Sequence, residues 1–396
     1  MSTGVTAPRG FRAAGVASGI KPGRLDLAMV AADRAVSAAG VFTQNRAQAA
    51  PVLVSREHLT GGRARAVVVN AGCANAATGH EGLCNAREMA ALSSRSLACR
   101  PEEIVVASTG VIGVHLPMEC VRAGIPAAAK ALSADGGGQA ALAIMTTDTR
   151  PKEAVVELTL GGVPVRVGAM AKGAGMIAPN MATMLAFFTT DADVAPLLLR
   201  QALVSAVGES LNRVTVDGDT STNDTAVILA SGASGAAVID APGSSFDAFR
   251  SALTEAASRI AEMIVRDGEG ATRVARIRIE GAASVAEADR VARTVAESPL
   301  VKTALHGGDP NWGRLLAAAG RAGVPFDPDA VSIWIGGVQV ASGGGACTYS
   351  EEEAHREMMR ETVEIRLALG QGDASSWMWT CDMSRGYVDI NAHYRS

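Results

Sequence analysis

The amino-acid sequence predicts a layered α/β protein with largely antiparallel sheets. Helical and strand patterns alternate along the chain, as in proteins that pack helices on sheets. Two segments, Val155–Met170 and Val331–Val340, place a Gly-Gly pair between apolar runs, and such a pair supplies the positive φ angles of a two-residue hairpin turn. The longest helical segment, Ser245–Arg266, carries one apolar stripe. Because hairpins join antiparallel strands, a purely parallel, doubly wound fold fits less well.

The individual elements follow from local patterns in chain order. Short apolar runs of the kind found in buried strands occur at Arg65–Asn70, Ile104–Ala107 and Met184–Thr190. The two hairpins turn at Gly161-Gly162 and Gly336-Gly337. Helices are predicted over Asp193–Asn212, Ser245–Arg266, Ser284–Glu297, Trp312–Ala319 and Glu351–Thr362.

Composition limits the classes of function. The chain has 396 residues, of which 48% are hydrophobic and 19% charged, so it is globular and long enough for one large or two ordinary domains. Acidic residues number 40 and basic residues 36, which gives a net charge of −4. Because no basic excess exists to neutralise phosphates, a nucleic-acid surface is not expected. Chemistry on small molecules is therefore the expected activity.

Membrane, secretion and metal signals are weak. The two longest uncharged stretches, 173–190 and 330–350, are interrupted by Gly, Pro, Ser and Thr, and the N-terminal segment lacks the apolar core of a signal peptide. A soluble cytoplasmic protein is therefore expected. The six cysteines form no Cys-x-x-Cys pair, so they are expected to be reduced thiols, and no metal site is predicted.

Two motifs resemble ligand-binding loops but lack the right context. Gly173–Ala178 matches the dinucleotide fingerprint G-x-G-x-x-A, yet Pro179 and Asn180 interrupt the helix that should begin there. The acidic stretch Asp217–Asp224 has its carboxylates at the wrong offsets for a calcium loop. A hydrogen-bonded turn is the stronger interpretation of this stretch.

The segment from Lys172 to Asp191 changes the interpretation of the whole chain. Taken alone, Thr183 would be a β-branched strand residue and Lys172 a solvated lysine. The segment nevertheless resembles the processing and active-site segment of the ornithine acetyltransferase family, also called ArgJ or bifunctional glutamate N-acetyltransferase. Further motifs of that family occur in the expected order at Ala39–Asn45, Ala49–Pro51, Ala107–Gly113, Met145–Thr149, Asp217–Asp224, Asp267–Ala271, Asp309–Arg314 and Asp389–Ala392.

This resemblance implies a fold and a processing step. The expected architecture is a helix–sheet–sheet–helix sandwich of the ornithine acetyltransferase or N-terminal-nucleophile type, with a smaller C-terminal α/β region from about residue 283. Members of the family cut themselves before a threonine. Here the bond would be Ala182–Thr183, so that residues 1–182 form an α chain and residues 183–396 a β chain. Both chains would build the catalytic body.

The resemblance also implies the reaction. Thr183 would take an acetyl group from N2-acetylornithine and pass it to L-glutamate in a ping-pong exchange of arginine biosynthesis. The side-chain hydroxyl of Thr109 and the backbone N–H of Gly110 would stabilise the oxyanion. No cofactor is expected, although acetyl-CoA could serve as a second acetyl donor. Two α and two β chains are expected to form a heterotetramer.

Substrate-binding roles carry over by resemblance to the positions that match the family's motifs: Thr146, Lys172, Thr183, Glu269, Asn391 and Ser396. Lys172 would meet a substrate carboxylate and Glu269 the amino end of ornithine. The alternative interpretations are a turn acid for Glu269 and an edge-strand amide for Asn391.

Several positions depart from the family's usual pattern. Cys73 replaces a common asparagine, Ser396 replaces a frequent threonine, and 377–387 is more divergent than its surroundings. One alternative function is therefore a paralogous self-processing acyltransferase, or an amidase, that acts on another N-acyl amino acid. Another is a catalytically silent binding protein that keeps the fold.

Overall fold

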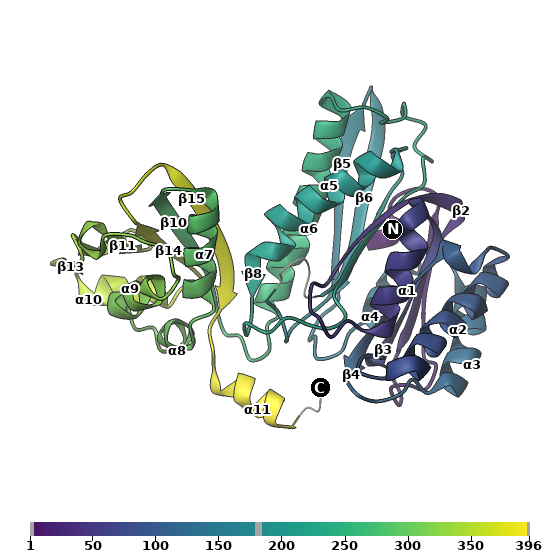
Figure 1. The fold of residues 1–396 in the computed structure, drawn as a ribbon, viewed down its shortest axis with the longest axis horizontal. Helices are drawn as coiled ribbons and strands as arrows, with labels where there is room; N and C mark the ends of the chain where they lie inside the picture. Colours follow the sequence, from purple (N-terminus) through teal and green to yellow (C-terminus); the bar gives the residue numbers. More distant parts are fainter. Residues whose placement is uncertain (1–3, 179–183, 394–396) are drawn as a thin grey trace. The chain divides into compact units, whose positions relative to one another are not determined.

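The computed structural model describes residues 4–178 and 184–393, and these divide into two compact units (Figure 1). The first unit takes the described residues of Met1–Asn212 and Asp219–Ile264. The second unit takes those of Arg213–Gly218 and Val265–Arg395. Each unit has its own sheet and is described separately.

The sheet of the first unit bends at its longest strand. Its strand order is β4-β3-β2-β9-β7-β6-β5, with β1 paired to β2. Residues Leu27–Ala31 of β2 pair with β3, the register shifts before Val36, and Ser37–Phe42 pair with β9. The strands are β1 Phe11–Val16, β2 Leu27–Phe42, β3 Arg63–Cys73, β4 Ile104–Val111, β5 Lys152–Leu160, β6 Val163–Lys172, β7 Leu185–Thr190 and β9 Thr225–Ala230.

The two halves of this bent sheet form facing layers. Val30 and Val69 from one half share a buried apolar cluster with Phe187 and Val227 from the other half. Helix α4, Gly137–Ala143, contributes three buried alanines to the same cluster. Burying both inner faces against one another supplies the main apolar core of this unit.

Helices cover the outer faces of both layers. Helices α1 (Ala50–His58), α2 (Gly79–Leu97) and α3 (Met118–Ala131) pack on the outer face of the β2–β4 half through residues such as Met89 and Ile125. Helices α5 (Pro196–Glu209) and α6 (Ser244–Arg266) lie side by side along the other half (Figure 1). The predicted helix–sheet–sheet–helix sandwich is thereby confirmed.

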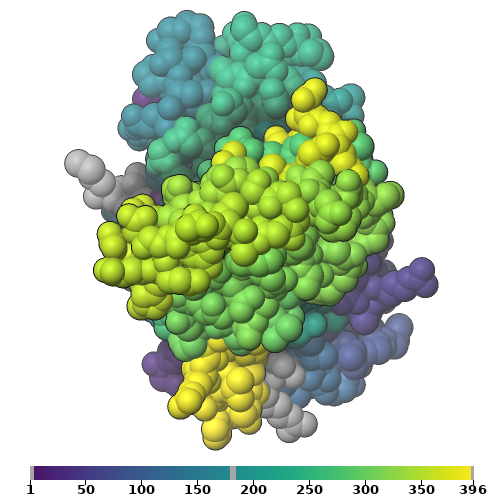
Figure 2. All heavy atoms as spheres, turned by 90° about the vertical axis from the view of Figure 1, so that its left-hand side faces the viewer, coloured from purple at the N-terminus to yellow at the C-terminus, as the bar shows by residue number. Residues whose placement is uncertain are grey.

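The second unit holds a seven-stranded sheet of order β13-β12-β11-β14-β10-β15-β8. The central strand β10 pairs in parallel with β14 and antiparallel with β15. Figure 2 shows one face of this unit in green to yellow. Its strands are β8 Val214–Thr215, β10 Val274–Ala282, β11 Ser332–Ile335, β12 Val338–Ser342, β13 Gly345–Ala346, β14 Thr362–Ala368 and β15 Ala374–Cys381. Its helices are α7 Val285–Ala296, α8 Pro299–Gly307, α9 Trp312–Gly320, α10 Glu351–Met358 and α11 Arg385–His393.

Most predicted elements are present. Both hairpins form, with Leu160 opposite Val163 and Ile335 opposite Val338. The prediction of largely antiparallel sheets is confirmed, since most strand pairs are antiparallel, although the local patterns did not show that β3–β4, β7–β9, β10–β14 and β15–β8 pair in parallel.

Two predicted boundaries also differ from the structure. Helix α10 ends at Met358 instead of Thr362, since Thr362 already pairs with Val274 in the sheet. The second unit begins at Val265 and not near 283, because β10 lies at the centre of its sheet. Within residues 4–178 and 184–393, no helix is long and apolar enough to cross a membrane.

Candidate active site

Several strands of the first unit end or begin at one edge of its two layers. Lys172, the last residue of β6, pairs with Leu185 at the start of β7, and Leu185 pairs with Thr225 at the start of β9. The Lys172 ammonium reaches across to the end of β4 and donates a hydrogen bond to Thr109 Oγ1 at 3.3 Å. Both side chains are buried. The interpretation of Lys172 as a solvated lysine was therefore wrong.

Gly110 follows Thr109 at a point where the backbone leaves no space for a side chain. Its φ is +129°, and a Cβ there would lie 2.3 Å from the carbonyl carbon of Gly72. The register between β3 and β4 is irregular at Gly72 and Cys73, so the neighbouring chain is pressed against Gly110. A glycine is needed at this position because any side chain would collide with that backbone.

Cys73 lies beside Thr109 in the same irregular pairing. Its thiol is buried and donates to the carbonyl of Val114 at 3.1 Å. Burial raises the pKa of this thiol. Cys73 therefore stays protonated at neutral pH and packs as a small apolar group in the cluster under α1–α3.

Asp148 ties the predicted residues of the first unit to one another. Its carboxylate accepts hydrogen bonds from the backbone N–H of Thr146 at 3.0 Å and of Gly173 at 2.7 Å. It also accepts from the fully buried Lys152 ammonium at 2.7 Å. Burial opposes ionisation, but the charges of Lys172 and Lys152 outweigh it and lower the pKa of Asp148 to about 2. A permanent negative charge therefore balances this buried lysine pair.

A second buried carboxyl, Asp224, has its pKa shifted in the opposite direction to that of Asp148. It precedes β9, and its Oδ2 has no hydrogen-bond partner among the described atoms. Burial raises the pKa of Asp224 well above its usual value, although Ser221, Thr43 and the charge of Lys172 act in the other direction. Asp224 is therefore favoured in its neutral form.

The turn before β9 is held by the hydrogen bonds that the sequence predicted there. The N–H of Asn223 donates to Ser221 Oγ, and Thr225 Oγ1 donates to the carbonyl of Asn223. The Asn223 amide also donates to the carbonyls of Ala74 and Ser108, which joins the start of β9 to the ends of β3 and β4. This turn therefore has a structural role at the edge of the site.

Sequence reasoning missed Lys21, which the fold places next to this cluster. Its ammonium donates to the carbonyl of Met145 at 2.8 Å, one residue before Thr146. Burial, together with the positive charges of Arg24 and Lys172, lowers the pKa of Lys21 to about 8. In the sequence, Lys21 lies between Gly19 and Gly23 and resembles an ordinary turn residue. Nothing in the neighbouring residues marks it as part of a site.

The second unit brings together two other predicted residues. Asn391, exposed on α11, donates through Nδ2 to Glu269 Oε2 at 2.8 Å. Gly270 has φ of +69°, and a Cβ there would lie 2.3 Å from the backbone nitrogen of Tyr387. The glycine therefore permits α11 to pack against the loop that carries Glu269. Asn391 lies on a helix, so its interpretation as an edge-strand amide was wrong.

Three predicted site residues, Ala182, Thr183 and Ser396, lie outside the described residues. Met184, directly after Thr183, is described and buried, and its carbonyl accepts a hydrogen bond from Thr225 N at 2.9 Å. The strand that starts after the predicted cleavage point is thus attached to β9 at the same edge as Lys172.

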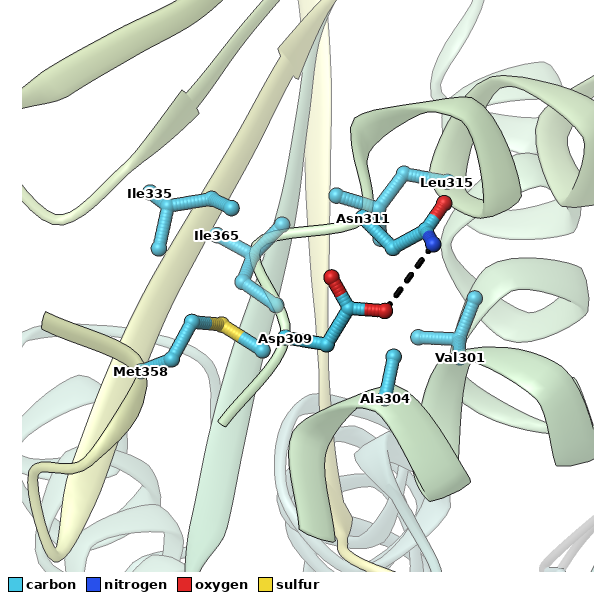
Figure 3. Close-up of a pocket in the computed structure, with 8 residues that line it drawn as sticks. All are labelled: Val301, Ala304, Asp309, Asn311, Leu315, Ile335, Met358 and Ile365. Carbon is cyan, nitrogen blue, oxygen red and sulfur yellow. Dashed lines mark hydrogen bonds between the residues drawn. The ribbon is translucent and has the colours of Figure 1, made fainter. Parts of the chain in front are cut away.

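Two other candidate features have structural explanations. Gly173–Ala178 forms bends and one isolated bridge, and no helix begins within these described residues, so a dinucleotide site does not form there. In the second unit, a small pocket contains Asp309 and Asn311, whose side chains bond one another at 3.0 Å (Figure 3). Because Asn311 also caps α9 through Arg314 N, this polar pair stabilises a helix start.

The Thr109 hydroxyl, the Gly110 N–H and the buried Lys172 ammonium lie at one strand edge of a layered α/β body. Such groups stabilise a developing oxyanion, so this arrangement is suited to acyl transfer. Residues 12–396 match the model of the ArgJ family. The chain is 48% identical, over its whole length and 99% of the relative, to the arginine biosynthesis bifunctional protein ArgJ of Symbiobacterium thermophilum. It is 47% identical to the protein of the same name from Parasynechococcus marenigrum, over its whole length and 96% of that relative.

The fold is also similar to a crystal structure described as arginine biosynthesis bifunctional protein ArgJ from Bacillus halodurans, with a TM-score of 0.51 and 39% sequence identity. The match covers 52% of the present chain and 98% of the Bacillus halodurans chain. The protein therefore belongs to the ArgJ family, as its motifs predicted. It is an acetyltransferase of arginine biosynthesis.

Proposed function

We propose that this protein transfers the acetyl group of N2-acetylornithine to L-glutamate through an acetyl-Thr183 intermediate. The observation that supports this most is the hydrogen bond from Lys172 to Thr109 beside Gly110. It lies at the strand edge where β7 begins, two residues after Thr183. The proposed oxyanion donors thus lie at the sheet edge where the strand that follows the candidate nucleophile in sequence begins.

We further propose that self-cleavage at Ala182–Thr183 creates the general base. A peptide nitrogen cannot take a proton from the Thr183 hydroxyl. A free α-amine has a pKa of about 7.7–8.0 and can do so near neutral pH. The threonine would then carry its base on its own residue, which replaces the histidine of other acyl-transfer enzymes.

The transfer proceeds in two half-reactions. Thr183 Oγ attacks the acetyl carbonyl as its proton passes to the α-amine, and the oxyanion is held by Thr109 and Gly110. The ornithine nitrogen takes that proton and leaves, so the acetyl group remains as an ester on Thr183. The amine of glutamate then attacks the ester, and Thr183 regains its hydroxyl proton. Removing one oxyanion donor typically slows such reactions about 100- to 1000-fold.

Opposite charges suit the substrates. Lys172 is assigned to a substrate carboxylate. Thr146 is assigned to substrate binding as well. Glu269, which accepts a hydrogen bond from Asn391, is assigned to the side-chain ammonium of ornithine. Ser396 is assigned to substrate binding by resemblance. An α-amino acid with a basic side chain needs both a cation and an anion for recognition.

The same proposal has four further parts. The enzyme has no resident cofactor and can use acetyl-CoA as a second acetyl donor. It is located in the cytoplasm and assembles from two α and two β chains. The α chain would be residues 1–182 and the β chain residues 183–396. The decisive assay compares acetylornithine with acetyl-CoA as donor for glutamate. Activity with acetylornithine alone would mark a monofunctional enzyme.

The cleavage step is tested by mass spectrometry under denaturing conditions. The wild-type chain should give two fragments divided before Thr183, and Thr183→Ala should give one uncut, inactive chain. A fully active but uncut wild-type chain would contradict the mechanism. Rapid turnover of other N-acyl amino acids with poor turnover of acetylornithine would instead support the paralogous acyltransferase.

A further inference from the structure

Lys21 is a cation at the edge of the site that the reaction described above does not use. One of its three N–H groups donates to the carbonyl of Met145 at 2.8 Å. The described residues supply no other hydrogen-bond acceptor to this ammonium. The Lys21 residue is only half-buried, so it is not enclosed in the core.

The loop that carries Lys21 is held in one conformation by the fully buried Asp26. Asp26 Oδ1 accepts from the N–H and the hydroxyl of Ser18, at 2.6 and 2.7 Å. Its Oδ2 accepts from the N–H of Gly19 at 3.0 Å and of Lys21 itself at 2.8 Å. Four hydrogen bonds to one carboxylate fix the backbone from which Lys21 extends, so the ammonium is preorganised for binding.

The stem of Lys21 lies against the strand that borders the oxyanion residues. A Cβ on Gly72 would come within 3.0 Å of Lys21 Cγ, and Gly72 pairs with Gly110. The anchoring carbonyl of Met145 directly precedes Thr146, which is itself partly exposed. Lys21 is thus placed next to two of the residues assigned to the reaction.

The charges around Lys21 leave it without a dedicated carboxylate partner. The acidic groups that act on it are Asp26 and Asp148, and both are occupied by other donors. The remaining charged groups that act on it, Arg24 and Lys172, are cations. A site with excess positive charge and unused N–H donors suits an anion.

We propose that Lys21 binds a carboxylate of the amino-acid substrates and is a specificity-determining residue of the transfer reaction. This inference rests on the proposed function. Two carboxylates have the required chemistry. The α-carboxylate is common to acetylornithine and glutamate, whereas the side-chain carboxylate belongs to glutamate alone.

The test uses full-length Lys21→Met and Lys21→Arg, with the exposed Lys130→Met on α3 as the matched control. Initial rates are measured against both substrates. Lys21→Met should raise KM about 10- to 100-fold, the range expected for a charged hydrogen bond, with a smaller change in kcat. Lys21→Arg, which keeps the charge, should recover most of the affinity. Lys130→Met should behave as wild type.

The pattern of KM distinguishes the two carboxylates. A rise for both substrates assigns Lys21 to the α-carboxylate, and a rise for glutamate alone assigns it to the side-chain carboxylate. Unchanged KM values for both substrates in a folded, cleaved Lys21→Met would overturn the inference, while the proposed function would stand. Absence of transfer by the wild-type enzyme would instead refute the proposed function.

A pH profile separates binding from a structural role and applies even if Lys21→Met does not fold. Because the pKa of Lys21 is lowered to about 8, the wild-type KM should rise as pH increases through 8 and the ammonium loses its charge. Arginine stays charged, so Lys21→Arg should lose this rise. The charged groups that act on Lys21, namely Arg24, Asp26, Asp148 and Lys172, are unchanged in that variant. An identical KM profile in wild type and Lys21→Arg would overturn the inference.

Discussion

At the scale of single residues, the site contrasts two buried carboxyl groups that both experience the charge of Lys172. Asp148 is surrounded by donors and is ionised, with its pKa lowered to about 2. Asp224 has one oxygen without a partner among the described atoms, and burial raises its pKa. Burial opposes the charge of both carboxyls, but only Asp148 has the positive charges of two lysines, Lys172 and Lys152, to outweigh it.

Asp148→Asn should destabilise the protein by about 3–5 kcal/mol, because it removes the carboxylate that the fully buried Lys152 bonds. The lowered pKa means that the wild-type contribution is present above about pH 4 and is lost as pH falls through about 2. Urea unfolding at pH 7 measures the effect. Asp33→Asn, which breaks an exposed pair with Arg12, is the control and should cost less than about 1 kcal/mol. Equal losses in both variants would contradict the role of Asp148.

Asp224→Asn should leave the stability at pH 7 unchanged or higher. The pKa of Asp224 is higher in the folded protein than in the unfolded chain. Its contribution to the free energy of unfolding is therefore complete below the unfolded-state pKa and is lost as pH rises through the folded-state pKa. The neutral amide lacks this dependence. The difference in melting temperature between Asp224→Asn and wild type should therefore grow from pH 5 to pH 8. A variant that parallels the wild type across this range would refute a neutral Asp224.

At the scale of elements, the irregular pairing of β3 with β4 shapes the region around Thr109 and Gly110, the proposed oxyanion donors. Gly72 and Gly110 lie side by side in the register, each with a positive φ. This close approach directs the end of β4, with Thr109, toward Lys172 on β6. A strand pair that ran regularly to its end would leave Thr109 in an ordinary ladder position.

Gly110→Ala should abolish acetyl transfer and lower the melting temperature, because the new Cβ would lie 2.3 Å from backbone of Gly72. Gly113→Ala is a matched control. Gly113 also has a positive φ, +79°, but a Cβ there meets nothing within 4 Å, so only the backbone preference changes. That preference costs about 1 kcal/mol. Comparable activity in the two variants would show that close packing at Gly110 does not matter.

At the scale of the whole molecule, the chain divides into two units whose borders do not follow simple sequence order. Residues Arg213–Gly218 join the sheet of the second unit through β8, although the chain on either side belongs to the first. The second unit fixes Glu269 and Asn391 together through the packing of α11 at Gly270. Helix α11 thus holds the carboxylate that is proposed to bind the ornithine ammonium.

Gly270→Ala should displace α11 and raise KM for acetylornithine, since the added methyl group collides with the Tyr387 backbone. Amide hydrogen exchange in residues 385–393 should become faster in this variant, with little change in the sheet of the first unit. Gly323→Ala, at a positive φ in open space of the same unit, is the control. Unchanged exchange of α11 would contradict the docking role of Gly270.

Local patterns allowed most elements to be predicted, because hairpin turns, apolar stripes and buried runs are encoded by neighbouring residues. The parallel pairings were not foreseen, since β7 and β9 are separated by α5 and their pairing depends on the whole layer. The end of α10 was misplaced for the same reason, because Thr362 follows the sheet and not its own helical pattern.

By itself, the sequence determined the family, the order of the motifs and the candidate nucleophile, because these are properties of a linear order of residues. Only the tertiary structure decided which side chains meet. The bend in β2 turns the ends of β4 and β6 toward one another, so that Lys172 reaches Thr109. Only the fold, too, gave Asp148, Asp224 and Lys21 their different pKa values, because burial and the distances between charges are set by packing in three dimensions.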